Sequence, residues 1–430
     1  MNIKLLKIVN IYVLMIKKSF RLGFFHLLSA NLFLQIAGFG MQIFLTRMLL
    51  EVDIGRIKIL QSFIAIIIIL AGLGVNTAIL KLCSENTNDD KKQIIFINGF
   101  KIILVIATFI TVIVYLISSF STMLSRDVIV NTAMKYYCLQ VPFIVLNDLG
   151  IAYLQAQKKI QLMSKMQILL RILIIIFSLL MTYIFGFYGY IVGIVGSNII
   201  ASIIFFVLFK NEKIRFNQVK VEYTYISKIL NIGVFAFAAN IIGQITASTD
   251  IIMLNYLVGD NEQIAYYGIA QLVIMGLRLI PTTLNQIMTP YLSQHSASIE
   301  KVKEIYNTYN KRMFILMLGT SILGILLVPF VIPFIFGQSY KESIQYFRIL
   351  LIGLFFWSIY SPKGITLLSI GKINFNFYAT LVVSVINVIL NFIFIKNLGM
   401  IGGAYATMIS YFLGIFTVGY AFKKVISKVK

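Results

Sequence analysis

Long apolar segments recur along the whole chain, and they constrain the fold more than any other feature of the sequence. Twelve runs, each of roughly 20 residues, are long enough to cross a bilayer as helices. Apolar residues make up 59% of the chain and charged residues only 12%, whereas a soluble fold of this size needs far more polar surface. We therefore predict an all-α polytopic membrane protein with twelve transmembrane helices.

The twelve predicted spans form two sets of six. The first set covers residues 24–44, 57–80, 94–117, 128–152, 166–185 and 188–209. The second set covers residues 229–253, 264–288, 313–336, 344–367, 375–395 and 401–422. A polar, basic stretch at residues 210–228 separates the two sets.

A shift of 210 residues superposes the two sets and places Gly189 on Gly399. Because six is an even number, both halves enter the membrane in the same direction, as parallel repeats do. We predict two six-helix lobes related by this parallel repeat, a common basis for alternating access. The predicted domains are a cytoplasmic lead-in at 1–21, a lobe at 22–209, a cytoplasmic linker at 210–228, and a lobe with a basic tail at 229–430.

The basic residues predict the orientation of the chain. Lysines and arginines in the loops on one side outnumber those on the other by about four to one. This asymmetry favours an inner (plasma) membrane protein with both termini in the cytoplasm. The net charge of +22 follows from the same loops, so it does not indicate a nucleic-acid partner.

The motifs of several functional classes are absent from the sequence. There are two cysteines, Cys83 and Cys138, and two histidines, His26 and His295, and none has the spacing of a metal site. No phosphate-binding loop of the ATPase type occurs. We therefore expect no metal, no cofactor and no enzymatic activity.

Basic residues inside the predicted spans are the first candidates for a site. A charge in the hydrocarbon region costs at least about 2.5–3.5 kcal/mol, so it tends to face a cavity or a partner. One interpretation is a cationic cavity that binds an anionic headgroup such as a phosphate. The alternative is side chains that reach the membrane surface, or ion pairs within one lobe. The candidates are Arg278, Lys101, Arg171, Arg348 and Lys135.

Acidic and neutral polar residues in the first and seventh spans are the second group of candidates. Asp250 could hold a proton or a coupling cation, or it could form a structural contact between helices. The neutral residues either line a polar cleft or bond neighbouring helices. They are Asn240 and Gln244 in the seventh span and Asn31 and Gln35 in the first.

Short motifs in these spans resemble those of the polysaccharide-transporter family, the O-antigen and repeat-unit flippases. This family shares a superfamily with multidrug and toxin extrusion exporters and lipid II flippases. The resemblance covers about residues 20 to 422. Its motifs are LTRML at 45–49, DIG at 53–55, DIIML at 250–254, YYGIA at 266–270, PYL at 290–292, Asn387 and Asn391, and GMIGGAYAT at 399–407.

The resemblance implies a function. Such proteins move an undecaprenyl-diphosphate-linked oligosaccharide from the cytoplasmic to the periplasmic leaflet, for O-antigen, capsule or a related glycan. It implies membrane lipid as a partner and a polysaccharide polymerase and chain-length regulator as possible ones, with a proton or ion gradient as the coupling energy. Two alternatives stay open: a cation-coupled multidrug antiporter, and a flippase for another lipid-linked cell-wall precursor.

Overall fold

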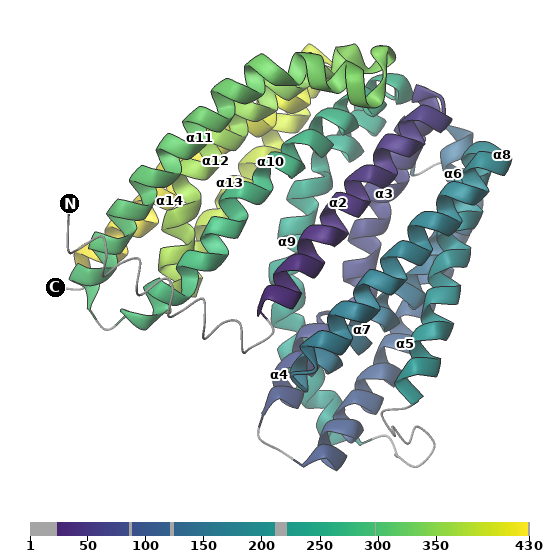
Figure 1. Cartoon of the computed structure of the whole chain (residues 1–430), viewed down its shortest axis with the longest axis horizontal. Coiled ribbons are helices and arrows are strands. Elements are labelled where there is room, and N and C mark those ends of the chain that lie inside the picture. Colours follow the sequence, from purple (N-terminus) through teal and green to yellow (C-terminus); the bar gives the residue numbers. More distant parts are fainter. Residues whose placement is uncertain (1–23, 86–87, 121–123, 211–221, 297, 429–430) are drawn as a thin grey trace. The chain divides into compact units, whose positions relative to one another are not determined.

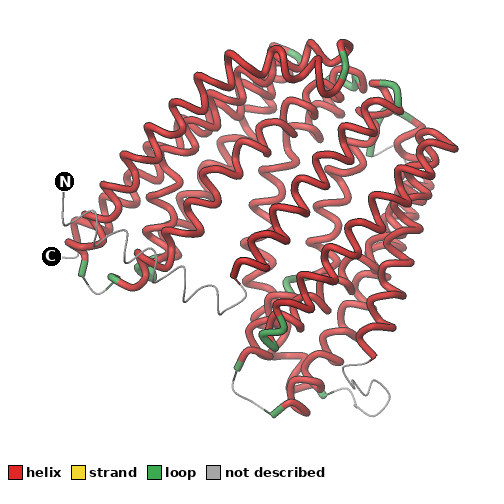
Figure 2. The backbone as a smooth tube through the Cα atoms, viewed as in Figure 1, coloured by secondary structure: helices red, strands yellow, loops and turns green. Residues whose placement is uncertain are grey.

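The structure is a computed structural model that describes residues 24–85, 88–120, 124–210, 222–296 and 298–428. Every regular element within these ranges is a helix (Figure 2), so the all-α prediction is confirmed. The predicted lead-in at 1–21 and most of the linker at 210–228 lie outside the described residues. Helices suit such an apolar chain because they satisfy their backbone hydrogen bonds internally.

The helices follow the predicted spans closely (Figure 1). In the first half they are α2 (Phe24–Met48), α3 (Glu51–Gly72), α4 (Val75–Ser84), α5 (Asp89–Phe120), α6 (Val128–Tyr137), the 3-10 turn η1 (Cys138–Gln140), α7 (Val141–Ala156) and α8 (Ile160–Lys210). In the second half they are α9 (Tyr223–Leu257), α10 (Asn261–Gln294), α11 (Ile299–Phe336), the 3-10 turn η2 (Gln338–Glu342), α12 (Ser343–Ser369), α13 (Ile373–Leu398) and α14 (Met400–Lys428).

Ten of the described helical segments are long and apolar enough to cross a membrane, judged by length and composition. Many large apolar side chains on them are exposed, such as Phe334 at 83% and Phe330 at 76%. Water would disfavour so much exposed apolar surface, whereas lipid accommodates it. The chain is therefore a multi-pass membrane protein.

The predicted span at 57–80 differs from the structure, because the helix breaks at Leu73 and Gly74. Both residues have positive φ, 42° and 68°. A side chain at Gly74 would meet the backbone oxygen of Gly233 on α9 at 2.1 Å. This close approach of two backbones needs glycine, and it divides the span into α3 and α4.

Two glycine turns, one in each half of the sequence, have nearly the same backbone conformation. Gly186 inside α8 has φ 60° and ψ −138°, and Gly399 between α13 and α14 has φ 66° and ψ −142°, a conformation that is essentially restricted to glycine. A Cβ on Gly189 would meet the Met181 oxygen at 1.9 Å, and one on Gly402 would meet the Phe394 oxygen at 2.2 Å. Each of these pairs is 213 residues apart, whereas the predicted register is 210 residues, and the repeat stays a prediction.

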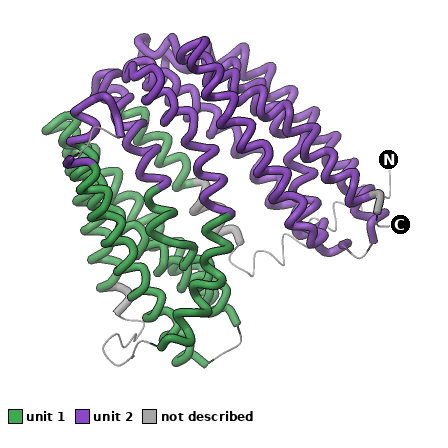
Figure 3. The backbone as a smooth tube through the Cα atoms, turned by 180° about the vertical axis from the view of Figure 1, so that it is seen from behind, with its two compact units in different colours: residues 1–45, 67–117, 133–238 green, residues 46–66, 118–132, 239–430 purple. Residues whose placement is uncertain are grey.

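The chain divides into two compact units, coloured separately in Figure 3. Unit 1 comprises residues 1–45, 67–117 and 133–238, and unit 2 comprises residues 46–66, 118–132 and 239–430. Unit 2 thus includes two short segments from the first half of the sequence. The two lobes at 22–209 and 229–430 stay a prediction.

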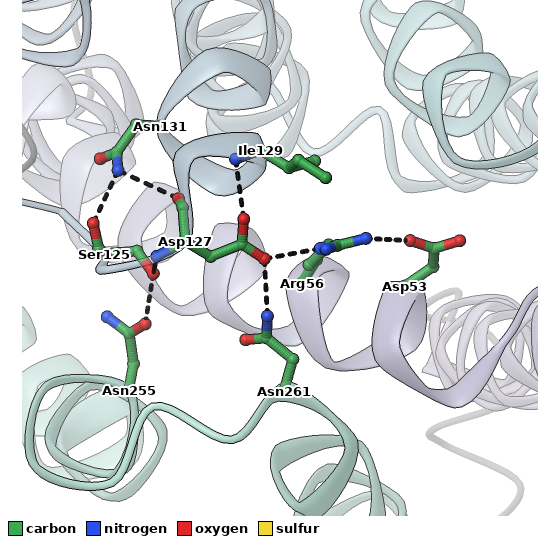
Figure 4. A network of polar contacts seen from close by, with 8 residues as sticks. All are labelled: Asp53, Arg56, Ser125, Asp127, Ile129, Asn131, Asn255 and Asn261. Atoms are coloured by element: carbon green, nitrogen blue, oxygen red, sulfur yellow. Dashed lines mark hydrogen bonds and ion pairs between the residues drawn. The ribbon is translucent and has the colours of Figure 1, made fainter.

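A polar network around Asp127 ties these segments into unit 2 (Figure 4). One carboxylate oxygen of Asp127 accepts hydrogen bonds from Arg56 and from Asn261, both at 2.7 Å. The other accepts from the backbone of Ile129 at 2.8 Å and so caps α6. Arg56 also pairs with Asp53 at 2.8 Å, and Ser125 donates to Asn255 at 2.7 Å.

Arg47 makes a second tie within unit 2. Its guanidinium donates to the carbonyl oxygens of Phe334 at 2.7 Å and Ile335 at 3.2 Å. These carbonyls belong to the last turn of α11, where helix carbonyls lack partners in their own helix. A cation is favourable there because of the helix dipole, which gives the arginine of the LTRML motif a structural role.

Replacing Asp127 by alanine should destabilise the protein by about 2–4 kcal/mol, because it removes a helix cap and leaves a largely buried arginine without its main partner. The check is the thermal transition of the purified protein in detergent. Asp89→Ala is the matched control. Asp89 is 88% exposed and lies 3.9 Å from Lys92, so that change should have little effect. Equal transitions for both variants would contradict the structural role of Asp127.

Candidate functional site

A buried carboxylate in unit 2, Asp250 on α9, is surrounded by neutral donors from three other helices. It is 3% exposed. Tyr267 on α10 donates its hydroxyl at 2.6 Å and Gln271 donates at 3.3 Å. Asn391 on α13 donates at 2.9 Å, and the Thr407 hydroxyl on α14 lies 2.9 and 3.1 Å from the two carboxylate oxygens.

A second ring of polar groups holds these donors in place. Asn387, one turn before Asn391, donates to Thr407 and to Ser410, both at 3.2 Å. The side-chain oxygen of Asn391 is buried and accepts no hydrogen bond from the described residues. Gly403 lies next to that oxygen, since a Cβ built on this glycine would be 3.6 Å from it. Asn391 thus contributes an unused acceptor beside a carboxylate.

The electrostatics of this cluster call for a positive partner. No basic side chain among the described residues forms an ion pair with Asp250. A buried ionised carboxylate is costly unless it is paired, coordinated or protonated. The described residues hold no group of three or more His, Cys, Asp or Glu side chains that could bind a metal ion. The cluster instead offers one carboxylate with neutral oxygens, which suits a proton or a monovalent cation.

Arg278 on α10 lies over the ring of Trp357 on α12, with its guanidinium carbon 4.3 Å from the ring centroid. This cation–π contact fixes the arginine without using its N–H donors. Arg278 is half-buried, and no hydrogen bond or ion pair within the described residues involves its guanidinium. A guanidinium that is held in place and has unused donors is suited to bind a phosphate through two parallel hydrogen bonds.

Arg171 on α8 is a second arginine, in unit 1, whose head group lies inside the protein. Its head group crosses the backbone of α2 at Gly38, where a Cβ would come within 2.3 Å of a guanidinium nitrogen. The Nε of Arg171 is buried and has no hydrogen-bond partner in the described part of the chain. Glycine at position 38 therefore provides the space in which this arginine lies.

The structure distributes the other sequence candidates over both units. Lys101 on α5 and Lys135 on α6 are half-buried in unit 1, and Lys101 has an interaction partner. Arg348 on α12 is exposed in unit 2. None of these three basic residues has a head group that is both held in place and unpaired, as Arg278 and Arg171 do.

The neutral candidates do not join the Asp250 cluster. Gln244 donates to Ser248 on its own helix at 2.9 Å, and Asn240 is exposed on α9. Gln35 is exposed on α2, and Asn31 also belongs to α2, but its side chain lies outside the described residues. Sequence reasoning assigned no site role to Tyr267, Gln271 or Thr407. Tyr267, Asn391 and Thr407 were quoted only as parts of family motifs.

Gly38→Ala should lower transport by about 3–10-fold, equivalent to ~1 kcal/mol, because the added methyl group displaces Arg171 without removing its charge. The measurement is export by an intact cell that carries the variant at normal membrane level. Gly243→Ala is the control, since a Cβ there meets nothing within 4 Å. Transport at the control rate would show that the position of Arg171 does not matter.

The chain thus combines a multi-pass helical fold with charged and polar groups inside its apolar spans. Sequence comparison assigns the family: the profile described as "Polysaccharide biosynthesis protein" matches residues 20–296. The chain is a member of the polysaccharide biosynthesis protein family. The MatE profile also matches, over residues 235–393. Family and fold are those of transporters rather than enzymes.

Two curated relatives come from bacteria. A Shigella flexneri protein provisionally named as an O-antigen transporter is 23% identical over 56% of this chain. The capsular polysaccharide biosynthesis protein CapF of Staphylococcus aureus is 25% identical over 43% of this chain. The matched regions span 58% and 47% of those two proteins, which is about half of their length.

Solved structures show the same fold. The lipid II flippase MurJ in an inward closed conformation superposes with a TM-score of 0.77 at 19% identity, over 92% of this chain and 87% of that one. An inward-facing multidrug resistance transporter of the MATE family gives a TM-score of 0.75 at 17% identity, over 92% and 95%. The two profile matches confirm the predicted family relationship, and these structures show that the fold is shared.

Proposed function

We propose that the protein is a flippase that moves an undecaprenyl-diphosphate-linked oligosaccharide repeat unit from the cytoplasmic to the periplasmic leaflet by alternating access. The glycan is an O-antigen, a capsule or a related polysaccharide. Family membership supports a polysaccharide-related substrate, and the Shigella and Staphylococcus relatives carry O-antigen and capsule in their names. In this proposal the protein acts in the inner membrane with both termini in the cytoplasm.

The observation that carries the proposal is the fixed and unpaired guanidinium of Arg278. A diphosphate has several oxygens that accept paired hydrogen bonds, and arginine provides parallel N–H donors for them. Trp357 holds the guanidinium at 4.3 Å, so little side-chain entropy is lost when the anion binds. The half-buried position of Arg278 also reduces the screening of its charge by water.

The Asp250 cluster supplies the coupling step of the proposal. A cation or a proton that enters the cluster neutralises the buried carboxylate and can engage the free oxygen of Asn391. Four helices, α9, α10, α13 and α14, contribute to the cluster. A change in its occupancy therefore alters the packing of several spans together, which is what coupling to transport requires.

The direct test is to measure the lipid-linked glycan in each membrane leaflet of a strain that lacks the gene. We expect the glycan to accumulate in the cytoplasmic leaflet, and we expect the restored gene to clear it. Normal surface polysaccharide without accumulation would overturn the proposal.

A cation-coupled multidrug antiporter is the second candidate function. The match of the MatE profile to residues 235–393 and the buried carboxylate of Asp250 favour it. The excess of basic residues within the spans disfavours it, because cationic drugs need an acidic cavity. Export of a cationic dye that depends on the gene, together with normal glycan export in its absence, would select this candidate.

A further inference from the structure

A cavity of about 220 Å³ lies inside unit 2, among helices α10, α12, α13 and α14. Pockets for whole drug-sized ligands measure about 300–1,000 Å³, so this cavity fits a single small ring rather than an oligosaccharide. Thr380 on α13, at its border, is exposed. The cavity is therefore reachable from outside the helix bundle.

Aromatic rings form part of its wall. Trp357 and Tyr360, both on α12, line the cavity. Trp357 is the only tryptophan in the chain, and its ring also makes the cation–π contact with Arg278. Aromatic faces pack well against the C–H groups of a sugar ring, because they present an apolar surface that needs no hydrogen bonds.

Two buried polar side chains on the wall retain unused donors. Asn285 and Ser361 are each 8% exposed. Asn285 accepts a hydrogen bond from Tyr309 at 2.7 Å and donates one of its two N–H groups to Ser361 at 3.2 Å. Its second N–H and the Ser361 hydroxyl proton have no acceptor among the described residues. Such buried donors favour a ligand with oxygen acceptors, because they are costly when they stay unpaired.

A third polar group reaches the cavity from α13. The half-buried side chain of Asn376 lies against Gly364 of α12, where a Cβ would come within 2.8 Å of its oxygen. Neither hydrogen bond nor ion pair engages this amide within the described residues. Aromatic faces together with amide and hydroxyl groups that both donate and accept suit a polyhydroxylated ring.

We infer that this cavity is a subsite for one sugar of the transported glycan, next to the arginine that binds the diphosphate. The inference rests on the proposed function and extends it, because it assigns a carbohydrate-recognition role to Trp357, Asn285 and Asn376. Trp357 joins the two parts of the site, since it holds Arg278 and lines the cavity. An anionic group and its adjoining sugar would thus be bound by neighbouring side chains of one unit.

Tryptophan fluorescence of the purified full-length protein tests the inference, since the single tryptophan reports on both parts of the site. The probes are glucose, galactose, N-acetylglucosamine, N-acetylgalactosamine and glucuronic acid, with the open-chain polyol sorbitol as the control for non-specific effects. We expect at least one sugar to change the emission of Trp357 in a saturable manner, and sorbitol to have no such effect. Inorganic pyrophosphate, added separately, reports on Arg278.

Substitutions sharpen this test. Asn285→Ala should raise the apparent Kd for the sugar at least 5-fold, as expected for about one lost hydrogen bond, and leave the response to pyrophosphate in place. Gly364→Ala, which displaces Asn376, should weaken sugar binding in the same direction. Asn307→Ala on the exposed face of α11 is the matched control and should bind as the parent does.

The outcomes separate the two proposals. No saturable response to any sugar, or an equal response to sorbitol, would overturn the subsite, whether or not pyrophosphate binds. A response to sugars that Asn285→Ala and Gly364→Ala leave unchanged would also overturn it, since the sugar would then bind elsewhere. A sugar response without a pyrophosphate response would instead contradict the role of Arg278 in diphosphate binding and leave the subsite standing.

Discussion

Arg278→Ala is expected to reduce glycan transport by roughly 10–100-fold, while the protein still inserts into the membrane. Hydrogen bonds to charged groups contribute about 1.5–3 kcal/mol, and a factor of ten corresponds to about 1.4 kcal/mol. The guanidinium lies over Trp357 and has unused donors, so its removal deletes an anion-binding group and breaks no internal hydrogen bond of its own. The measurement is lipid-linked glycan in each leaflet, at matched protein level.

Two further variants make the result specific for Arg278. Arg278→Lys keeps the charge and loses the paired donors, so it should retain part of the activity. Arg312→Ala removes an exposed arginine from α11 and should transport normally. Normal export by Arg278→Ala would refute an anion-binding role for this residue.

Asp250→Asn should reduce transport at least ~10-fold, equivalent to ~1.4 kcal/mol, and make the remaining activity independent of the ion gradient. Asparagine has the same shape as aspartate and can still bond Tyr267 and Thr407, so the fold should persist. It carries no charge, and a cation that leaves water needs the full carboxylate charge as compensation. The measurement is transport in proteoliposomes with imposed proton and sodium gradients, which also identifies the coupling ion.

The control for Asp250→Asn is Glu300→Gln, the same chemical change at an exposed position near the start of α11. We expect this control to respond to the gradient as the parent protein does. Asp250→Ala should behave differently from Asp250→Asn, because it leaves the buried hydroxyl of Tyr267 without its acceptor and so lowers thermal stability. Gradient-driven transport by Asp250→Asn at the parent rate would refute the coupling role.

Apolar runs predict membrane helices well, because span length is set by bilayer thickness and the backbone must bond within each span. The helices therefore matched the predicted spans at most positions. The break at Leu73 and Gly74 escaped prediction, since it arises from the approach of Gly74 to Gly233. Contacts between residues so far apart in the chain leave no local pattern in the sequence.

For the candidate sites, too, the sequence predicts single residues but not the contacts that packing brings about. Asp250 and Arg278 were predictable because a charge in an apolar span is costly and therefore conspicuous. Their contacts were not, since Trp357, Asn391 and Thr407 are neutral and come from later helices, and the family motifs that include Asn391 and Thr407 give them no partner. The exposed positions of Arg348 and Asn240 were equally hidden, because helices that are apolar on all sides do not reveal which face is buried.

The similar glycine turns at Gly186 and Gly399 allow the residues near them to be compared between the two halves of the sequence. In the 213-residue register of these hairpins, Asn391 corresponds to Ser178 and Thr407 to Ile194. Ser178 contacts the sulfur of Met41 on α2 at 3.9 Å, where its counterpart Asn391 contacts the carboxylate of Asp250. The polar residue near this hairpin thus contacts a carboxylate in the second half of the chain and a thioether in the first. If the Asp250 cluster couples transport as proposed, the cation would bind in only one half of the chain at this position.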